Sequence, residues 1–114
     1  MKKTRILMIM FFAILIVAGA CKDKDSDNDL DCSTVTFSAD IAPIIASKCA
    51  TTGCHNSGSV VGDYTTYDGL KDKAQNGVME QEVITDKTMP QSGSLSQDEL
   101  DKFQCWFDDG APNN

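Results

Sequence analysis

Apolar residues recur at helical spacing along the chain, first in the stretch after residue 40. Ile41, Ile44 and Ile45 stand at positions i, i+3 and i+4, so they share one face of a helix. Asp40 directly before them is a residue type that caps helix N-termini. We therefore predict a helix from Ile41 into Lys48, capped by Asp40, that leads straight to the next cysteine.

Two more helices are predicted in the middle of the chain. The first begins at Thr66 or Tyr67 and continues through Leu70. Gly77 is placed to end it, because glycine readily takes the left-handed conformation that follows many helices. A short third helix is expected over 78–85.

The last predicted helix carries the strongest local signals. Residues 96–99 read Ser-Gln-Asp-Glu, the pattern of a capping box, and Leu95 with Leu100 fits a hydrophobic staple around it. Leu100, Phe103 and Phe107 then share one stripe, and a glycine followed by a proline is placed to end the helix.

The pattern as a whole predicts an all-α domain of helices and loops, because no window sustains the alternation of a strand. The domain covers residues 32–114, and domains of this size often rely on disulfides, metals or a cofactor. A large apolar prosthetic group would complete its modest set of candidate core residues, which are Phe37, Ile41, Ile44, Ile45, Val60, Val61, Leu70, Val78, Val83, Ile84, Leu95, Leu100, Phe103, Trp106 and Phe107.

The first 20 residues read as a targeting segment. Two lysines and an arginine precede an apolar run over 6–17, and small residues lead up to Cys21. The run is shorter than the roughly 20 apolar residues that a permanent span needs. We expect a signal peptide over 1–20 followed by an acylated Cys21, since this order resembles the lipobox of bacterial lipoproteins. A plain signal peptide and an uncleaved anchor are the alternatives.

The chain beyond residue 20 is strongly acidic. All 17 acidic residues follow that position and three of the ten basic residues precede it, which leaves a net charge of −10. Such a surface argues against binding of nucleic acid and is compatible with docking on a basic partner protein. Residues 21–31 hold little that could be buried, so we expect an acidic linker between the lipid and the domain.

The candidate chemistry is concentrated at residues 49–55, C-A-T-T-G-C-H. In a C-x-x-C-H motif two thiols bind the haem vinyl groups, and the adjacent histidine becomes the proximal iron ligand. Here Cys49 and Cys54 are separated by four residues rather than two, and Gly53 allows the longer loop to bulge. His55, the single histidine of the chain, follows directly. The motif favours covalent haem attachment.

Two other uses of these cysteines stay open on the motif alone. Cys49 and Cys54 could form a structural disulfide, with His55 incidental. A zinc site needs four ligands, and the missing ones would have to come from Cys32 and Cys105. In favour of haem, one lipid, two thioethers and one disulfide account for all five cysteines.

A methionine in a polar loop offers a second iron ligand. Met89 precedes Pro90 between the third and the last predicted helix, where core packing explains it poorly. A thioether sulfur opposite the histidine favours reduced iron and raises the potential. Met79 competes for this role, but it lies in a predicted helix and is better explained by packing.

In this order the segments resemble a known family. They read F-S-A-D-I-A-P-I-I-A-S-K-C, G-C-H-N, T-Y-D-G-L-K, T-M-P, L-S-Q-D-E-L and C-W-F-D-D-G-A-P-N-N. The chain is similar in these segments to the small class I cytochrome c domains of bacterial lipoproteins and of larger extracytoplasmic proteins. The likeness covers nearly all of 32–114, and the chain departs from the family in its lengthened attachment loop.

The resemblance implies a small cytochrome c fold, with helices and loops wrapped around one covalent haem c. Cys49 and Cys54 would form the thioethers, and His55 and Met89 would be the axial iron ligands. The implied function is one-electron transfer with redox partner proteins. With both axial positions filled we expect no enzymatic activity, whereas a vacant position at Met89 would suit a sensor or a peroxidase-like enzyme.

The resemblance also bears on the two remaining cysteines. Cytochrome c domains pack the N-terminal segment against the C-terminal helix, so a disulfide between Cys32 and Cys105 would tie the two ends together. Two separate buried thiols are the alternative. Trp106 is expected to fill the core rather than to contact the haem edge.

The expected protein is thus an extracytoplasmic electron carrier with a lipid anchor in a bacterial membrane, on the periplasmic side or at the cell surface. The alternative is a haem-free, disulfide-stapled lipoprotein with a binding or structural role.

Overall fold

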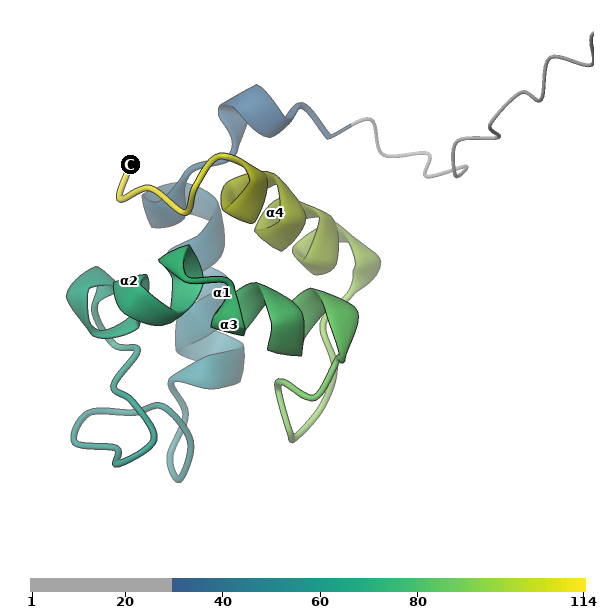
Figure 1. Cartoon of the computed structure of the whole chain (residues 1–114). Helices are drawn as coiled ribbons and strands as arrows, with labels where there is room; N and C mark the ends of the chain where they lie inside the picture. Colours follow the sequence, from purple (N-terminus) through teal and green to yellow (C-terminus); the bar gives the residue numbers. More distant parts are fainter. Residues whose placement is uncertain (1–29) are drawn as a thin grey trace, which may run out of the picture.

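The computed structural model describes residues 30–114, and this part of the chain is built of helices and loops, without a strand. The predicted all-α class is confirmed for these residues (Figure 1). The predicted signal peptide, its acylation site Cys21 and most of the acidic linker lie outside the described residues. No helix within 30–114 is long and apolar enough to cross a membrane.

The first long helix covers residues 37–49 in three consecutive segments. These are the wide π-helical turn η2 (Phe37–Ile41), the short α1 (Ala42–Ile44) and a second π-helical turn, η3 (Ile45–Cys49). A single 3₁₀ turn, η1 (Cys32–Thr34), precedes them. The helix therefore ends on the first cysteine of the predicted attachment motif.

The start of this helix differs from the prediction. The helix begins four residues earlier than Ile41, and the hydroxyl of Thr36 accepts the cap hydrogen bond from the Ala39 N–H at 3.2 Å. Asp40 reaches back instead, and its Oδ2 accepts from the Thr36 N–H at 3.0 Å. The prediction that Asp40 is the N-cap is wrong, because Thr36 caps the helix and Asp40 lies inside its first turn, which begins at Phe37.

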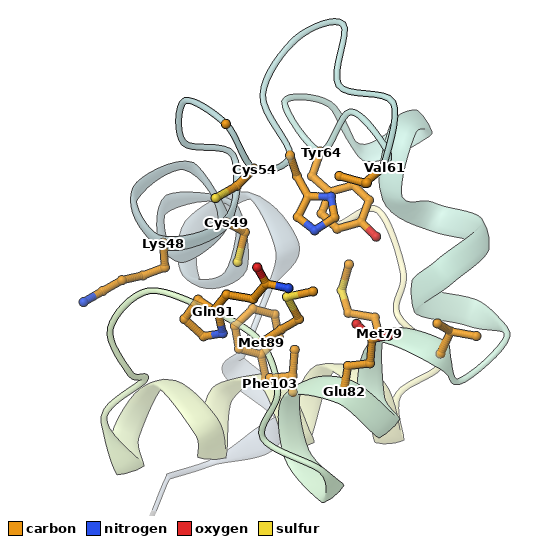
Figure 2. A pocket seen from close by; sticks show the side chains of 15 residues that line it. Lys48, Cys49, Cys54, Val61, Tyr64, Met79, Glu82, Met89, Gln91 and Phe103 are labelled. Carbon is orange, nitrogen blue, oxygen red and sulfur yellow. The ribbon is translucent and has the colours of Figure 1, made fainter.

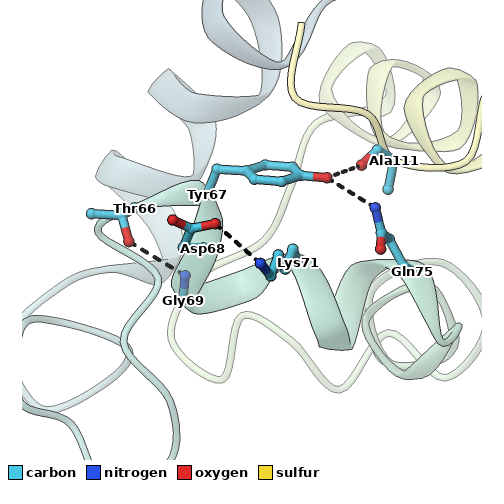
Figure 3. Close-up of polar contacts among 7 residues, drawn as sticks. All are labelled: Thr66, Tyr67, Asp68, Gly69, Lys71, Gln75 and Ala111. Carbon is cyan, nitrogen blue, oxygen red and sulfur yellow. Dashed lines mark hydrogen bonds and ion pairs between the residues drawn. The ribbon is translucent and has the colours of Figure 1, made fainter.

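The two middle helices follow the prediction. α2 (Tyr67–Gln75) begins after Thr66, whose hydroxyl accepts a hydrogen bond from a backbone N–H in the first turn (Figure 3). Gly77 beyond its end has a φ of +83°. α3 (Val78–Glu80) continues without a break into the π-helical turn η4 (Gln81–Thr85).

The last helix, α4 (Gln97–Asp108), has the predicted capping box. The Ser96 hydroxyl accepts from the Glu99 N–H at 3.2 Å, and the Ser96 N–H donates to the Glu99 carboxylate at 2.8 Å. Gly110 follows the helix with a φ of +86°, and its N–H donates to the Phe107 carbonyl at 2.9 Å. Capping at both ends thus defines the helix as predicted.

The core lies where the first helix and the helices of residues 67–85 meet α4. Trp106 is buried in it, its ring stacks on Phe37 with centroids 5.6 Å apart, and its indole N–H donates to the Pro112 carbonyl. Trp106 is therefore a core residue, as predicted. The fully buried side chains of largest volume are Trp106, Phe103, Ile41 and Leu70.

Three of the candidate core residues are exposed. Val60, Val61 and Val78 are 102%, 61% and 39% exposed, so the prediction that they belong to the core is wrong. Val60 and Val61 lie in the long loop between the first helix and α2, which has no helical face to pack. Val61 and Val78 instead edge the cavity described below.

The two ends of the described chain are joined to each other. Cys32 forms a disulfide with Cys105 of α4, which is the pairing expected from the sequence. Asn114 covers the start of the first helix, since its side-chain oxygen accepts from the Phe37 N–H at 2.7 Å and its carbonyl accepts from the Ser38 N–H at 3.0 Å. Figure 1 shows the C-terminus beside the beginning of that helix.

Candidate functional site

A largely apolar cavity of about 200 Å³ opens between the loop after the first helix, the helix of residues 78–85 and the loop that follows it (Figure 2). All four residues predicted to hold a haem line this one cavity. The lining consists of Lys48, Cys49, Gly53, Cys54, His55, Val61, Tyr64, Val78, Met79, Glu82, Val83, Met89, Pro90, Gln91 and Phe103.

The two cysteines of the motif come to the cavity from the two ends of a closed loop. Cys49 ends the first helix, and its carbonyl accepts a hydrogen bond from the His55 N–H at 3.0 Å. Gly53 between them has a φ of +84°, the conformation that lets the four-residue loop turn back. The lengthened loop therefore still brings both sulfurs to one wall, as Figure 2 shows for Cys49 and Cys54.

Both thiols are unpaired. Burial raises the pKa of Cys49 to about 11, with smaller contributions from the neighbouring Cys54 and from Glu99. At neutral pH Cys49 is consequently a neutral thiol. The alternative in which Cys49 and Cys54 form a disulfide is not what the structure has.

His55 is held by its own loop. Its Nδ1 lies 3.1 Å from the carbonyl oxygen of Gly62. A carbonyl can only accept, so Nδ1 carries the proton and the lone pair is on Nε2. The Tyr64 ring stacks on the imidazole, with centroids 3.9 Å apart and planes inclined by 4°, and the Tyr64 N–H donates to the His55 carbonyl at 2.9 Å.

Gly62 and Tyr64 also contribute to the site, and the sequence pattern did not indicate it. A glycine and an aromatic residue seven and nine positions after the histidine are the only signal of this contact, and helical or strand periodicity does not reach across such a loop. Tyr64 is about half-buried. Burial raises the pKa of its phenol, and negative charge on Glu82 and Cys49 raises it further by smaller amounts.

Both candidate methionines line the cavity. Met79 comes from α3 and is 7% exposed, and Met89 comes from the following loop and is partly buried. The N–H groups of Thr88 and Met89 both point to the Glu82 carbonyl, at 2.9 and 3.3 Å, which anchors that loop to its helix. Figure 2 shows Met79 and Met89 across the cavity from Tyr64.

The zinc interpretation does not fit the arrangement. It required Cys32 and Cys105 as further ligands, and these two are paired with each other. Among residues 30–114, no group of three or more histidine, cysteine or acidic side chains is clustered for a metal ion.

The lining residues suit a covalently attached haem. Two thiols lie on one wall, an imidazole has its lone pair on Nε2, thioethers lie across the cavity, and the remaining walls are mainly apolar. No protein-family model, curated protein or solved structure matches this chain. The arrangement of its own residues therefore carries the functional argument.

Proposed function

We propose that the protein is an extracytoplasmic electron carrier that holds one covalent c-type haem in this cavity. The observation that carries the proposal is that two unpaired thiols, an oriented imidazole and a loop thioether all line one apolar cavity. Such a haem, when bound, supplies an iron centre that takes up and releases one electron.

Each of the chain's groups has a separate task in this proposal. Cys49 and Cys54 form the two thioethers, which fix the cofactor to the end of the first helix and its loop. His55 binds the iron through Nε2, while Gly62 holds the proton on Nδ1 and so fixes the tautomer. Met89 would supply the second iron ligand, and its loop is anchored by two backbone hydrogen bonds.

The walls of the cavity favour a redox role over an enzymatic one. Val83 and Phe103 are buried and line the cavity beside the methionines, so they limit the access of water. A largely apolar surrounding would favour the reduced iron, and an iron held by both His55 and Met89 would leave no position for a substrate. We therefore propose a carrier and not an enzyme.

The partners and the location belong to the same proposal. An acidic chain of net charge −10 after residue 20 suits docking on a basic redox partner protein, and it disfavours nucleic acid. Acylation of Cys21 would hold the carrier at a bacterial membrane.

Intact-mass spectrometry tests the proposal directly. The mature protein, produced together with haem-ligation machinery, is expected to gain the mass of one haem and to give a c-type pyridine haemochrome spectrum. The double variant C49A/C54A is the control and should gain nothing. A wild-type protein that stays colourless and unmodified would contradict the proposal and favour the haem-free, disulfide-stapled alternative.

A further inference from the structure

The contact between Tyr64 and His55 is closer and flatter than the other aromatic contacts of the domain. Its centroid distance of 3.9 Å and its interplanar angle of 4° describe two rings lying face to face. The other aromatic pairs within the described residues have centroids 5.1 to 6.4 Å apart and angles of 24° to 75°. The other pairs show the distances and angles that packing in the core produces. The short, parallel contact between Tyr64 and His55 therefore has to arise from the local structure around the two residues.

The local cause is the closure of the loop between His55 and Tyr64. The Tyr64 N–H donates to the His55 carbonyl, and the Gly62 carbonyl lies at hydrogen-bonding distance from the imidazole. Gly62 also has a φ of +114°, and a Cβ built there would stand 3.0 Å from the Tyr64 ring and 3.7 Å from Nδ1. Only a glycine leaves room for both rings to lie in this way.

Tyr64 thus covers one face of the imidazole while Gly62 holds one edge. Rotation of the imidazole about its bond to Cβ would bring it into the phenol ring. The Tyr64 hydroxyl group is not needed for this, since the contact is made by the ring face.

We propose that Tyr64 is a positioning residue that fixes the plane of the His55 imidazole and lowers the reduction potential of the carrier. This inference rests on the proposed function. The face of an aromatic ring is electron-rich and attracts positive charge. An imidazole bound to ferric iron is more positive than one bound to ferrous iron, so the stacked phenol stabilises the oxidised state relative to the reduced one.

The other tyrosine of the chain provides a matched control. Tyr67 packs edge-on against Phe37 with centroids 5.1 Å apart, and its hydroxyl donates to the Ala111 carbonyl at 2.7 Å (Figure 3). It does not line the cavity that contains His55. Removing its ring therefore loosens the core without uncovering the imidazole.

The test compares the midpoint potentials of holoproteins carrying Y64L, Y64F or Y67L with that of the wild type. We expect a higher potential in Y64L only, because Y64F keeps the stacked ring and Y67L leaves the stack intact. In the reduced wild-type protein, nuclear Overhauser effects between the ring protons of Tyr64 and His55 are expected as well. The Overhauser measurement uses the wild-type protein alone, so it still tests the stacking of the two rings if Y64L fails to fold.

An unchanged potential in Y64L would overturn the inference, as would an equal rise in Y67L or in Y64F. Lack of a ring-to-ring Overhauser effect in the wild type would also overturn it. These outcomes leave the proposed function standing. If the wild type carries no haem, the proposed function fails and this inference fails with it, so the two failures are distinguishable.

Discussion

Gly62 is the residue on which the geometry around His55 depends most. Its φ of +114° lies outside the range that other residues adopt at low cost, and a methyl group there would meet the Tyr64 ring at 3.0 Å. We expect G62A to lower the free energy of unfolding by about 2–3 kcal/mol, from backbone strain together with displacement of the ring.

Gly58 of the same loop is the control for that prediction. It also has a positive φ, +77°, but a Cβ there would meet nothing within 4 Å. G58A should therefore show only the backbone term, about 1 kcal/mol. Urea unfolding of the two variants separates the terms, and equal losses would mean that the crowding around Gly62 is unimportant.

Cys49 should react slowly with thiol reagents before haem is attached. Its pKa of about 11, against an ordinary value of 9.0, leaves about a hundredfold less thiolate at pH 8. The higher nucleophilicity of a more basic thiolate restores about tenfold, so we expect alkylation about tenfold slower than in the unfolded chain.

Peptide mapping after timed alkylation with iodoacetamide measures this rate in the folded protein and in the same protein in denaturant. Because only the thiolate reacts, the folded-state rate should keep rising with pH until about pH 11. A rate that levels off near pH 9 would show that burial does not raise the pKa of this thiol.

Met89 and Met79 differ in how they reach the cavity. Met89 lies in a loop and is partly exposed, so it is better placed to bind the iron. Met79 is almost fully buried on α3. We expect the weak far-red absorbance that the cytochrome resemblance predicts for methionine ligation to be lost in M89A and kept in M79A. The reverse result would assign the ligand to Met79, and an unchanged spectrum in both variants would exclude a methionine ligand.

At the scale of elements, the start of α2 packs so closely against the preceding loop that Gly69 cannot be replaced on helix propensity alone. Glycine to alanine inside a helix usually stabilises by about 1 kcal/mol. At Gly69, however, a Cβ would run into the backbone carbonyl of Asp63, which cannot move aside as a side chain can. We expect G69A to destabilise the domain instead, despite the better propensity of alanine.

Circular dichroism during thermal unfolding measures the effect, with D72A as the control. Asp72 is an exposed position of the same helix, so its replacement should shift the midpoint little. A midpoint that rises in G69A would mean that the loop before α2 yields at no cost.

The helices were predictable where capping and apolar spacing act over a few residues, as at Ser96 with Glu99 and at the end of α2. The start of the first helix was not, because an aspartate can stand at the N-cap or, as Asp40 does, inside the first turn, where its carboxylate accepts from the Thr36 N–H. The candidate site residues could be named from the chemistry of the cysteine motif and of the Met-Pro loop, and all of them line one cavity. The support that Tyr64 gives to His55 depends on how a ten-residue loop closes, which no local rule specifies.

On the scale of the whole molecule, the core and the cavity share the same few elements. Phe103 of α4 packs on Trp106 in the core and also lines the cavity, and Val83 belongs to both as well. A group that fills the cavity would extend the apolar core directly. If the proposed haem fills the cavity, the protein without it should be the less stable form, since ligand binding to the folded state adds to its stability.

The disulfide between Cys32 and Cys105 holds the ends of the domain together across 73 residues of sequence. Closing a loop of this length restricts the unfolded chain and stabilises the fold by about 4 kcal/mol in the chain-entropy model. We expect C32A/C105A to lose about that amount in urea unfolding. Reductant should lower the wild-type stability similarly and leave the double variant unchanged.

Made on the protein without haem, the reductant comparison isolates the crosslink, because the disulfide is the bond within the described residues that a mild thiol reduces. Asn114 still joins the C-terminus to the first helix in the double variant, through hydrogen bonds from Phe37 and Ser38. The variant should therefore keep its helical spectrum and unfold at lower urea. If wild-type stability is the same with and without reductant, and both thiols alkylate without prior reduction, the two ends are held by packing alone.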